Sequence, residues 1–297
     1  MIDEGCVVAS TVVDSMAHLP SAEWFPTLDQ AVTDLCRTSG VRRQAIDAMV
    51  WALPLIIDPG LRRATRAFGK FEDVTDEDFC SRAEERFGLP LLLDGDARAA
   101  AIGEWQAGAG KGSDDLVMIT LGTGIGTGVI QNGYPVRGRT GMAGTLGGLS
   151  ITHLGSPGSD RVAPGCTEGQ VATWALPERV AAHPEFGASS LSNVSPVDYQ
   201  ALFSHAAQGD PLACTIRDHA LEAWGALTLN LIQAFDPGRV VIGGGIMAAA
   251  EIILPPVRRF VRDHAIQPGG PVEIVAGTLG DHAALIGCEW IWNHASR

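Results

Sequence analysis

Residues 121–130 read LGTGIGTGVI and follow directly on the apolar run DLVMIT of residues 115–120. With GVIQNG at 128–133, they predict two strands joined by a glycine turn as an antiparallel hairpin. Glycine has no Cβ, so the backbone N–H groups of such a turn can approach an anion, and threonine hydroxyls add further donors. The same sequence is also typical of a tight hairpin in which the glycines serve only to permit a positive φ. Phosphate binding and a purely structural turn therefore both stay open.

Strand and helix patterns alternate on both sides of this hairpin. Before it we expect strands at 6–14, 48–58 and 89–94, and helices at 27–40, 75–88 and 97–110. After it we expect helices at 168–180, 196–207 and 211–235, a strand at 239–245, a helix to about 263, a strand at 271–277 and a closing helix at 281–294. This order predicts an α/β fold with mostly parallel sheets. The Gly- and Ser-containing stretch GAGKGSDD separates two expected domains, 1–110 and 111–297.

Composition and charge exclude several classes of function. The formal net charge is −13 over 297 residues, and no run of basic residues would attract a nucleic acid backbone. No apolar run reaches the roughly 18 residues of a membrane-spanning helix, and the acidic start MIDEG does not resemble a signal peptide. The six cysteines are widely spaced, without a disulfide or metal pattern. We therefore expect a cytoplasmic protein with neither a membrane nor a nucleic acid partner.

A second glycine run, GGG at 243–245, ends a predicted strand and precedes a helix. Such a position lets the backbone lie against a phosphate or a flat ring. The two glycine segments together predict a nucleotide site. Its candidate residues are Gly122, Thr123, Gly124, Gly126, Thr127, Gly243, Gly244 and Gly245.

Four stretches resemble the ROK family of sugar kinases and regulators. LGTGIGTGVIQNGYPVRGRTGMAGTLGG is similar to its second phosphate motif and signature region, and FDPGRVVIGGGI to its adenosine motif. LLLDGDARAAAIGEW resembles the segment of the catalytic aspartate, and GDHAALIGC the C-terminal helix. The resemblance implies two actin-like (ribonuclease H-like) domains with a cleft, ATP with Mg²⁺ on one side, a sugar at the base, and a possible homodimer.

The resemblance also implies roles for two carboxylates. Asp96 would accept the proton of a sugar hydroxyl as it attacks the γ-phosphorus. A helix N-cap is the alternative role for Asp96. Glu168, in GCTE, would accept hydrogen bonds from sugar hydroxyls, and the alternative is an ordinary acidic residue at a helix start.

The substrate region departs from the family pattern. Gly95 stands where the family has asparagine, and Thr145 to Gly148 replace its Glu-x-Gly-His, which removes polar partners of a sugar. We therefore expect an amino sugar, a deoxy sugar or a cyclitol rather than plain glucose. Cys166 and His153 alone cannot complete a four-ligand site, so no structural zinc is expected.

The front of the chain lacks the family's DxGGT turn, and residues 1–5 resemble the turn that follows its second strand. We therefore expect an N-terminal domain truncated by two strands. Three explanations stay open: an upstream start, repacking that borrows an edge from a second subunit, or loss of phosphoryl transfer. The leading hypothesis is an ATP-dependent kinase of a sugar or sugar-like hydroxyl. The alternatives are a non-catalytic sugar- or nucleotide-binding sensor and a hydrolase that uses Asp96 with Glu168.

Overall fold

The glycine hairpin lies inside the larger of the sheets. The computed structural model describes residues 1–58, 60–152 and 163–295. Within them this sheet has the strand order β11-β10-β7-β8-β9. Its strands are β7 (Leu116–Leu121), β8 (Ile125–Gln131), β9 (Tyr134–Pro135), β10 (Arg239–Gly243) and β11 (Glu273–Ala276). β7 and β8 pair antiparallel, as predicted, and β10 runs parallel to both β7 and β11.

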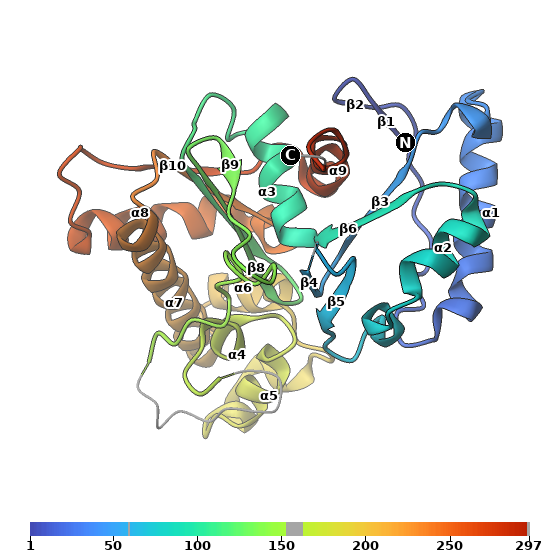
Figure 1. The fold of residues 1–297 in the computed structure, drawn as a ribbon. Coiled ribbons are helices and arrows are strands. Elements are labelled where there is room, and N and C mark those ends of the chain that lie inside the picture. The colour runs from blue at the N-terminus through green and yellow to red at the C-terminus, as the bar shows by residue number, and fades with distance from the viewer. Residues whose placement is uncertain (59, 153–162, 296–297) are drawn as a thin grey trace.

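Helices from the second half of the chain pack on this sheet (Figure 1). They are α4 (Thr167–Val171), α5 (Leu176–Ala181), α6 (Tyr199–Ala207), α7 (Pro211–Phe235) and α8 (Ala250–His264). Trp224 and Leu227 of α7 are fully buried in the same hydrophobic cluster as Val240 of β10. One helix expected over 168–180 is instead two, because Pro177 can begin α5 but cannot continue α4.

The N-terminal elements form a separate group, at the right of Figure 1. They are β1 (Ile2–Asp3), β2 (Cys6–Val7), α1 (Ser21–Ser39), β3 (Met49–Leu53), β4 (Ile56–Asp58), β5 (Arg63–Arg66), α2 (Phe79–Phe87) and β6 (Leu91–Gly95). β3 pairs with β6 in parallel, and β4 with β5 antiparallel. Trp24, Phe25, Trp51, Phe79 and Phe87 pack ring against ring in their core.

The strand expected over 6–14 is wrong except for its first two residues. Only Cys6–Val7 is extended in a pair, with Ile2–Asp3, and Val12 is 97% exposed. The β-branched composition favours a strand, but a strand needs a neighbouring strand to bond with. In the described ranges, residues 8–14 belong to none of the paired strands.

Two helices lie between the two groups of strands. They are α3 (Asp96–Ala107) and α9 (Ala283–Asn293), which pack against each other in the middle of the molecule (Figure 1). A Cβ built at Gly103 would lie 1.9 Å from the carbonyl oxygen of Ala283, and one at Gly287 equally close to that of Ala99. The backbones therefore touch where the helices cross. The boundary between domains 1–110 and 111–297 stays a prediction.

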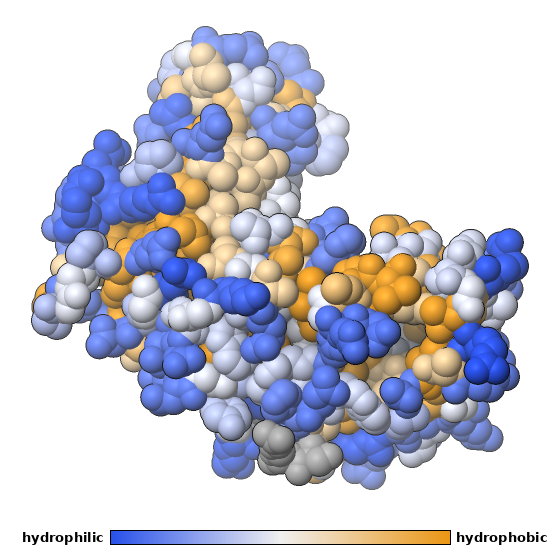
Figure 2. All heavy atoms as spheres, turned by 90° about the horizontal axis from the view of Figure 1, so that it is seen from above, coloured by the Kyte–Doolittle hydropathy of each residue, from blue (hydrophilic) through white to orange (hydrophobic). Residues whose placement is uncertain are grey.

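Short 3-10 helices complete the fold, at Arg43–Ala45, Glu72–Thr75, Phe186–Ala188, Ser190–Asn193, Gly245–Ala249 and Gly280–His282. Seen from above, the surface has a recess between two protruding parts, with patches of hydrophobic residues beside it (Figure 2). Among the described helices, none combines the length and the apolar character that crossing a bilayer requires.

Candidate functional site

The two glycine segments emerge side by side at one edge of the large sheet. β7 and β10 are parallel, and Thr120 lies opposite Gly243 in their register. The turn Gly122–Gly124 and the run Gly243–Gly245 therefore begin next to each other. Gly244 has φ of +93°, and a Cβ there would lie 2.3 Å from the carbonyl oxygen of Leu121. Only glycine fits this close approach of two backbones.

The glycines of LGTGIGTG divide into two groups. At the turn, Gly122 N–H donates to Gly124 O at 3.1 Å, and Thr123 is exposed. Further along, a Cβ at Gly126 would lie 2.7 Å from Ala97 Cβ, and one at Gly128 would lie 2.5 Å from Ala101 Cβ. These later glycines allow α3 to pack directly on β8.

Two predicted nucleotide residues therefore have packing roles. Gly126 faces α3, and the buried Thr127 hydroxyl donates to Gly144 O and accepts from Leu146 N–H at 2.6 Å. The Thr127 oxygen thus holds the neighbouring loop, and the nucleotide roles of Gly126 and Thr127 stay predictions. Accessible backbone remains at the turn Gly122–Gly124 and at Gly244 and Gly245, whereas Gly243 is buried.

Asp96 begins α3, directly after Gly95. The capping position belongs to Gly95, and Asp96 is the first helical residue, so the N-cap alternative does not describe it. Asp96 Oδ1 accepts the N–H of Ala97 at 2.7 Å. Desolvation by the surrounding protein raises the pKa of this carboxyl, while the Ala97 N–H and the charge of Lys70 act to lower it. A carboxylate with a raised pKa is suited to accepting a proton.

Glu168 lies against the glycine turn. Its Oε1 accepts the indole N–H of Trp174 at 3.2 Å and would be 3.0 Å from a Cβ on Gly124. Desolvation raises the pKa of Glu168, the indole N–H lowers it, and the negative charge of Asp96 raises it. The two carboxylates are thus close enough to affect each other electrostatically. The structure brings together the predicted base, the predicted acceptor residue and the turn.

Thr145 and Gly148 are exposed on the loop that runs beside Glu168. The N–H of Glu168 donates to Gly147 O at 3.0 Å, so Gly148 is next to the residue that Glu168 binds. Gly147 itself has no room for a side chain, since a Cβ there would lie 2.0 Å from Ile125 O. Gly148 therefore lies next to a residue that contacts Glu168, and Thr145 lies three residues earlier on the same loop.

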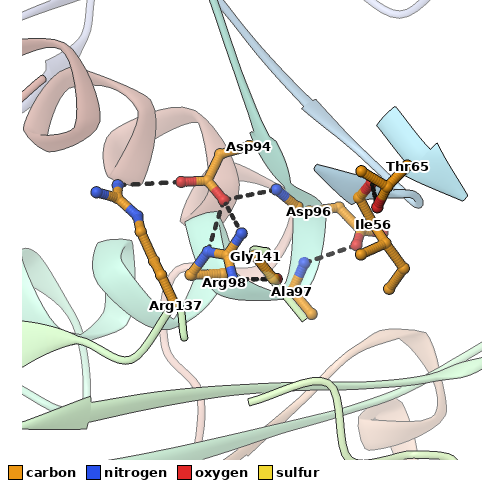
Figure 3. A network of polar contacts seen from close by, with 9 residues as sticks. Ile56, Thr65, Asp94, Asp96, Ala97, Arg98, Arg137 and Gly141 are labelled. Atoms are coloured by element: carbon orange, nitrogen blue, oxygen red, sulfur yellow. Dashed lines mark hydrogen bonds and ion pairs between the residues drawn. The ribbon is translucent and has the colours of Figure 1, made fainter. Parts of the chain in front are cut away.

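A buried ionic network beside Asp96 was not predicted from the sequence. Asp94 and Arg98 are 3% and 6% exposed, and Arg98 Nε donates to Asp94 Oδ1 at 2.6 Å. Arg137 approaches Asp94 from the other side, with Nη2 3.2 Å from Oδ2, and Arg98 Nη1 donates to Gly141 O at 2.9 Å (Figure 3). Asp94 lies in β6 and Arg98 in α3, so this pair forms across the strand-to-helix junction and has no helix-pair signal in the sequence. The sequence also contains no pattern that predicts the contacts of Arg137 and Gly141 with this pair.

Trp174 was missed as well. It lies in the turn between α4 and α5, where one continuous helix was expected. Its backbone N–H donates to Thr123 O at 3.2 Å, and Thr173 N–H donates to Gly122 O at the same distance. No sequence signal marks it, because its role depends on the helix break.

The only metal expected from the sequence is Mg²⁺ bound together with a nucleotide. Cys166 is buried and its Sγ accepts the N–H of Gly169 at 3.3 Å, as the N-cap of α4. His153 lies outside the described residues. In the part of the chain that is described, no three or more His, Cys, Asp or Glu side chains gather as a metal site. Mg²⁺ is commonly bound through one or two carboxylates together with substrate phosphates, and the exposed Asp96 fits that arrangement.

The sequence model of the ROK family matches residues 5–295. The chain belongs to the ROK family. It is 36% identical over 214 residues to a glucokinase of Thermotoga maritima, covering 70% of this chain and 67% of that relative, about two thirds of its length.

Two solved structures share the fold. The ROK hexokinase of Thermus thermophilus superposes with a TM-score of 0.76 at 28% identity, covering 96% of this chain and 90% of that one. A ROK glucokinase of Streptomyces griseus, in complex with glucose and AMPPNP, gives 0.69 at 27% identity, covering 89% and 86%. The predicted α/β fold with two actin-like domains is confirmed.

Proposed function

We propose that this protein transfers the γ-phosphoryl group of ATP to a hydroxyl of a hexose. The observation that carries the proposal is the placement of two electrostatically coupled carboxylates, Asp96 and Glu168, beside the turn Gly122–Gly124. One carboxylate serves as the base and the other holds the acceptor. The glucokinase and hexokinase relatives support the same reaction class.

Asp96 accepts the proton of the attacking hydroxyl. Its raised pKa makes it a stronger base than an ordinary aspartate, and Ala97 N–H and Lys70 favour the ionised form that accepts the proton. Glu168 orients the acceptor by accepting hydrogen bonds from it. Mg²⁺ would neutralise charge on the phosphates when bound with ATP.

The nucleotide lies along the two glycine segments. The backbone of Gly122–Gly124 contacts phosphate groups, and Gly243–Gly245 receives the adenosine, because the glycines of the two segments have no Cβ that would hold the ligand away. The carbonyls of Gly122 and Thr123 are held by Thr173 and Trp174, which fixes the turn. ATP is the expected nucleotide.

The acceptor is a hexose, with glucose as the first candidate. Gly95, Thr145 and Gly148 offer few hydrogen bonds and had suggested an amino sugar, a deoxy sugar or a cyclitol. The glucokinase relatives do not favour that specificity. Unpaired sugar hydroxyls cost about 1 to 3 kcal/mol each in a closed site, so we expect a higher KM for glucose than an enzyme with the full set of polar partners has.

ATP-dependent ADP release tests the proposal, with glucose, N-acetylmannosamine, 2-deoxyglucose and inositol as acceptors. Asp96→Asn should lower kcat by at least about 100-fold and leave the acceptor KM within about twofold. Asp218→Asn, which removes an exposed carboxylate on α7, is the matched control and should behave as wild type. No release with any acceptor from a folded sample would reject the kinase.

A non-catalytic sugar- and nucleotide-binding sensor is the second candidate. The observation in its favour is that Gly95, Thr145 and Gly148 leave the predicted acceptor region with few polar partners for a sugar. Calorimetric titration with glucose and AMPPNP separates the two candidates. Binding without ADP release would favour the sensor.

A further inference from the structure

Trp174 connects the two halves of the proposed site through two separate groups. Its backbone N–H donates to Thr123 O, within the turn proposed for the phosphates, at 3.2 Å. Its indole Nε1–H donates to Glu168 Oε1, also at 3.2 Å. One residue therefore holds a nucleotide-side carbonyl and an acceptor-side carboxylate at once.

The indole N–H also decides which oxygen of Glu168 is free. Oε1 is bound to Trp174 and lies against Gly124, whereas Oε2 accepts no hydrogen bond from the described residues. The carboxylate plane is thus fixed, with one oxygen left for an acceptor hydroxyl. Holding such a group in one orientation before binding reduces the entropy lost when the acceptor binds.

We infer that Trp174 is a positioning residue that orients Glu168 for the acceptor and couples the acceptor's affinity to occupation of the Gly122–Gly124 turn. The inference rests on the proposed function. A nucleotide that shifts the turn also shifts Trp174, through Thr123, and with it Glu168. Acceptor and nucleotide then bind with positive cooperativity, which is reciprocal by thermodynamic linkage.

Trp174→Phe tests the role of the indole N–H that binds Glu168. It keeps an aromatic ring and the backbone bond to Thr123 but removes the N–H. We expect the KM of the acceptor to rise about tenfold, the scale of a hydrogen bond to a charged group, and the affinity for AMPPNP in the absence of acceptor to change by less than about twofold. Trp105→Phe is the control, because it loses the same group about 14 Å along α3 from Asp96, outside the site.

The pH profile supplies a readout that a merely structural role would not change. The indole N–H lowers the pKa of Glu168, so its removal should move the acid limb of kcat/KM for the acceptor to higher pH. Asp96 of α3 is the charged group acting on Glu168 within the described residues, and the turn and Gly147 present no titratable side chain. An unchanged acceptor KM and an unchanged acid limb in Trp174→Phe would overturn the inference.

Binding without turnover separates this inference from the proposed function. In the wild type, AMPPNP should raise the affinity for glucose several-fold in calorimetric titrations, and Trp174→Phe should abolish that increase. The indole ¹H–¹⁵N resonance of Trp174 in the free protein should follow the titration of Glu168 and stop doing so in Glu168→Gln. If the resonance follows Glu168 but no sugar is phosphorylated, the kinase fails and the positioning role stands. If ADP is released normally but glucose affinity does not depend on AMPPNP, the coupling is wrong.

Discussion

At the scale of single residues, the site depends on how the protein tunes Asp96. Desolvation raises its pKa, and the positive charge of Lys70 works in the opposite direction. The residue must be ionised to accept a proton, so activity is present above its pKa and is lost as pH falls through it. Because the pKa of Asp96 is raised, activity is lost at a higher pH than it would be with an ordinary aspartate.

Lys70→Met should move that loss further toward neutral pH. Removal of the lysine charge takes away one of the interactions that offset the desolvation and so raises the pKa of Asp96 further. Lys111→Met, at the chain's other lysine, is the control and should leave the profile unchanged. The measurement is kcat/KM between pH 4 and 8, and coincident acid limbs for all three proteins would contradict the prediction.

At the scale of elements, the junction of β7 and β10 depends on one glycine. Gly244 combines φ of +93° with a Cβ position 2.3 Å from Leu121 O, whereas a Cβ at Gly245 meets nothing within 4 Å. These neighbours therefore form a matched pair of sites for the same substitution.

Gly244→Ala should lower the free energy of unfolding by about 1 to 3 kcal/mol, because a strained backbone and a clash must both be accommodated. It should also weaken AMPPNP binding, since the run shifts away from the turn Gly122–Gly124. Gly245→Ala should change stability by less than about 0.5 kcal/mol. Urea denaturation and calorimetry measure both effects, and equal results at the two positions would count against the close approach described here.

The same scale shows what sequence patterns can and cannot predict. The β7–β8 hairpin, α7, and helix ends at Gly40 and Gly88 follow from local signals. The prediction of a strand over 6–14 was wrong because a strand requires a neighbouring strand with which to pair. The break before α5 is marked in the sequence by Pro177, which lay inside a single predicted helix. Gly126 and Gly128 are indistinguishable by sequence from phosphate-binding glycines, because close packing and close ligand approach both require the absence of a Cβ.

At the scale of the whole molecule, the Asp94 network joins the two groups of strands. Asp94 lies in β6, Arg98 lies on α3, and Arg137 and Gly141 belong to the loop after β9. A Cβ at Gly141 would lie 1.7 Å from Ile57 O in β4, so this loop also contacts the N-terminal group directly. The predicted site residues Asp96 and Thr145 lie on the segments that this network connects.

Asp94→Asn should lower the free energy of unfolding by about 3 kcal/mol, because two arginines would lose a buried counter-charge. Asp34→Asn removes an exposed partner of Arg37 and should leave the urea midpoint unchanged. The buried variant should also reduce kcat, as Asp96 is two residues away. Stability indistinguishable from wild type would show that Asp94 is dispensable.

The crossing of α3 and α9 has a consequence for the order in which the protein can form. The backbone of α3 at Gly103 is covered by Ala283, and Glu289 accepts the N–H of Gly5 at 2.6 Å. Both contacts are made by residues near the C-terminal end of the chain. During synthesis on the ribosome, the helix that begins with Asp96 therefore stays uncovered on one face until α9 has emerged, so a nascent chain that lacks α9 already contains the residues of the proposed site and cannot yet hold them in place.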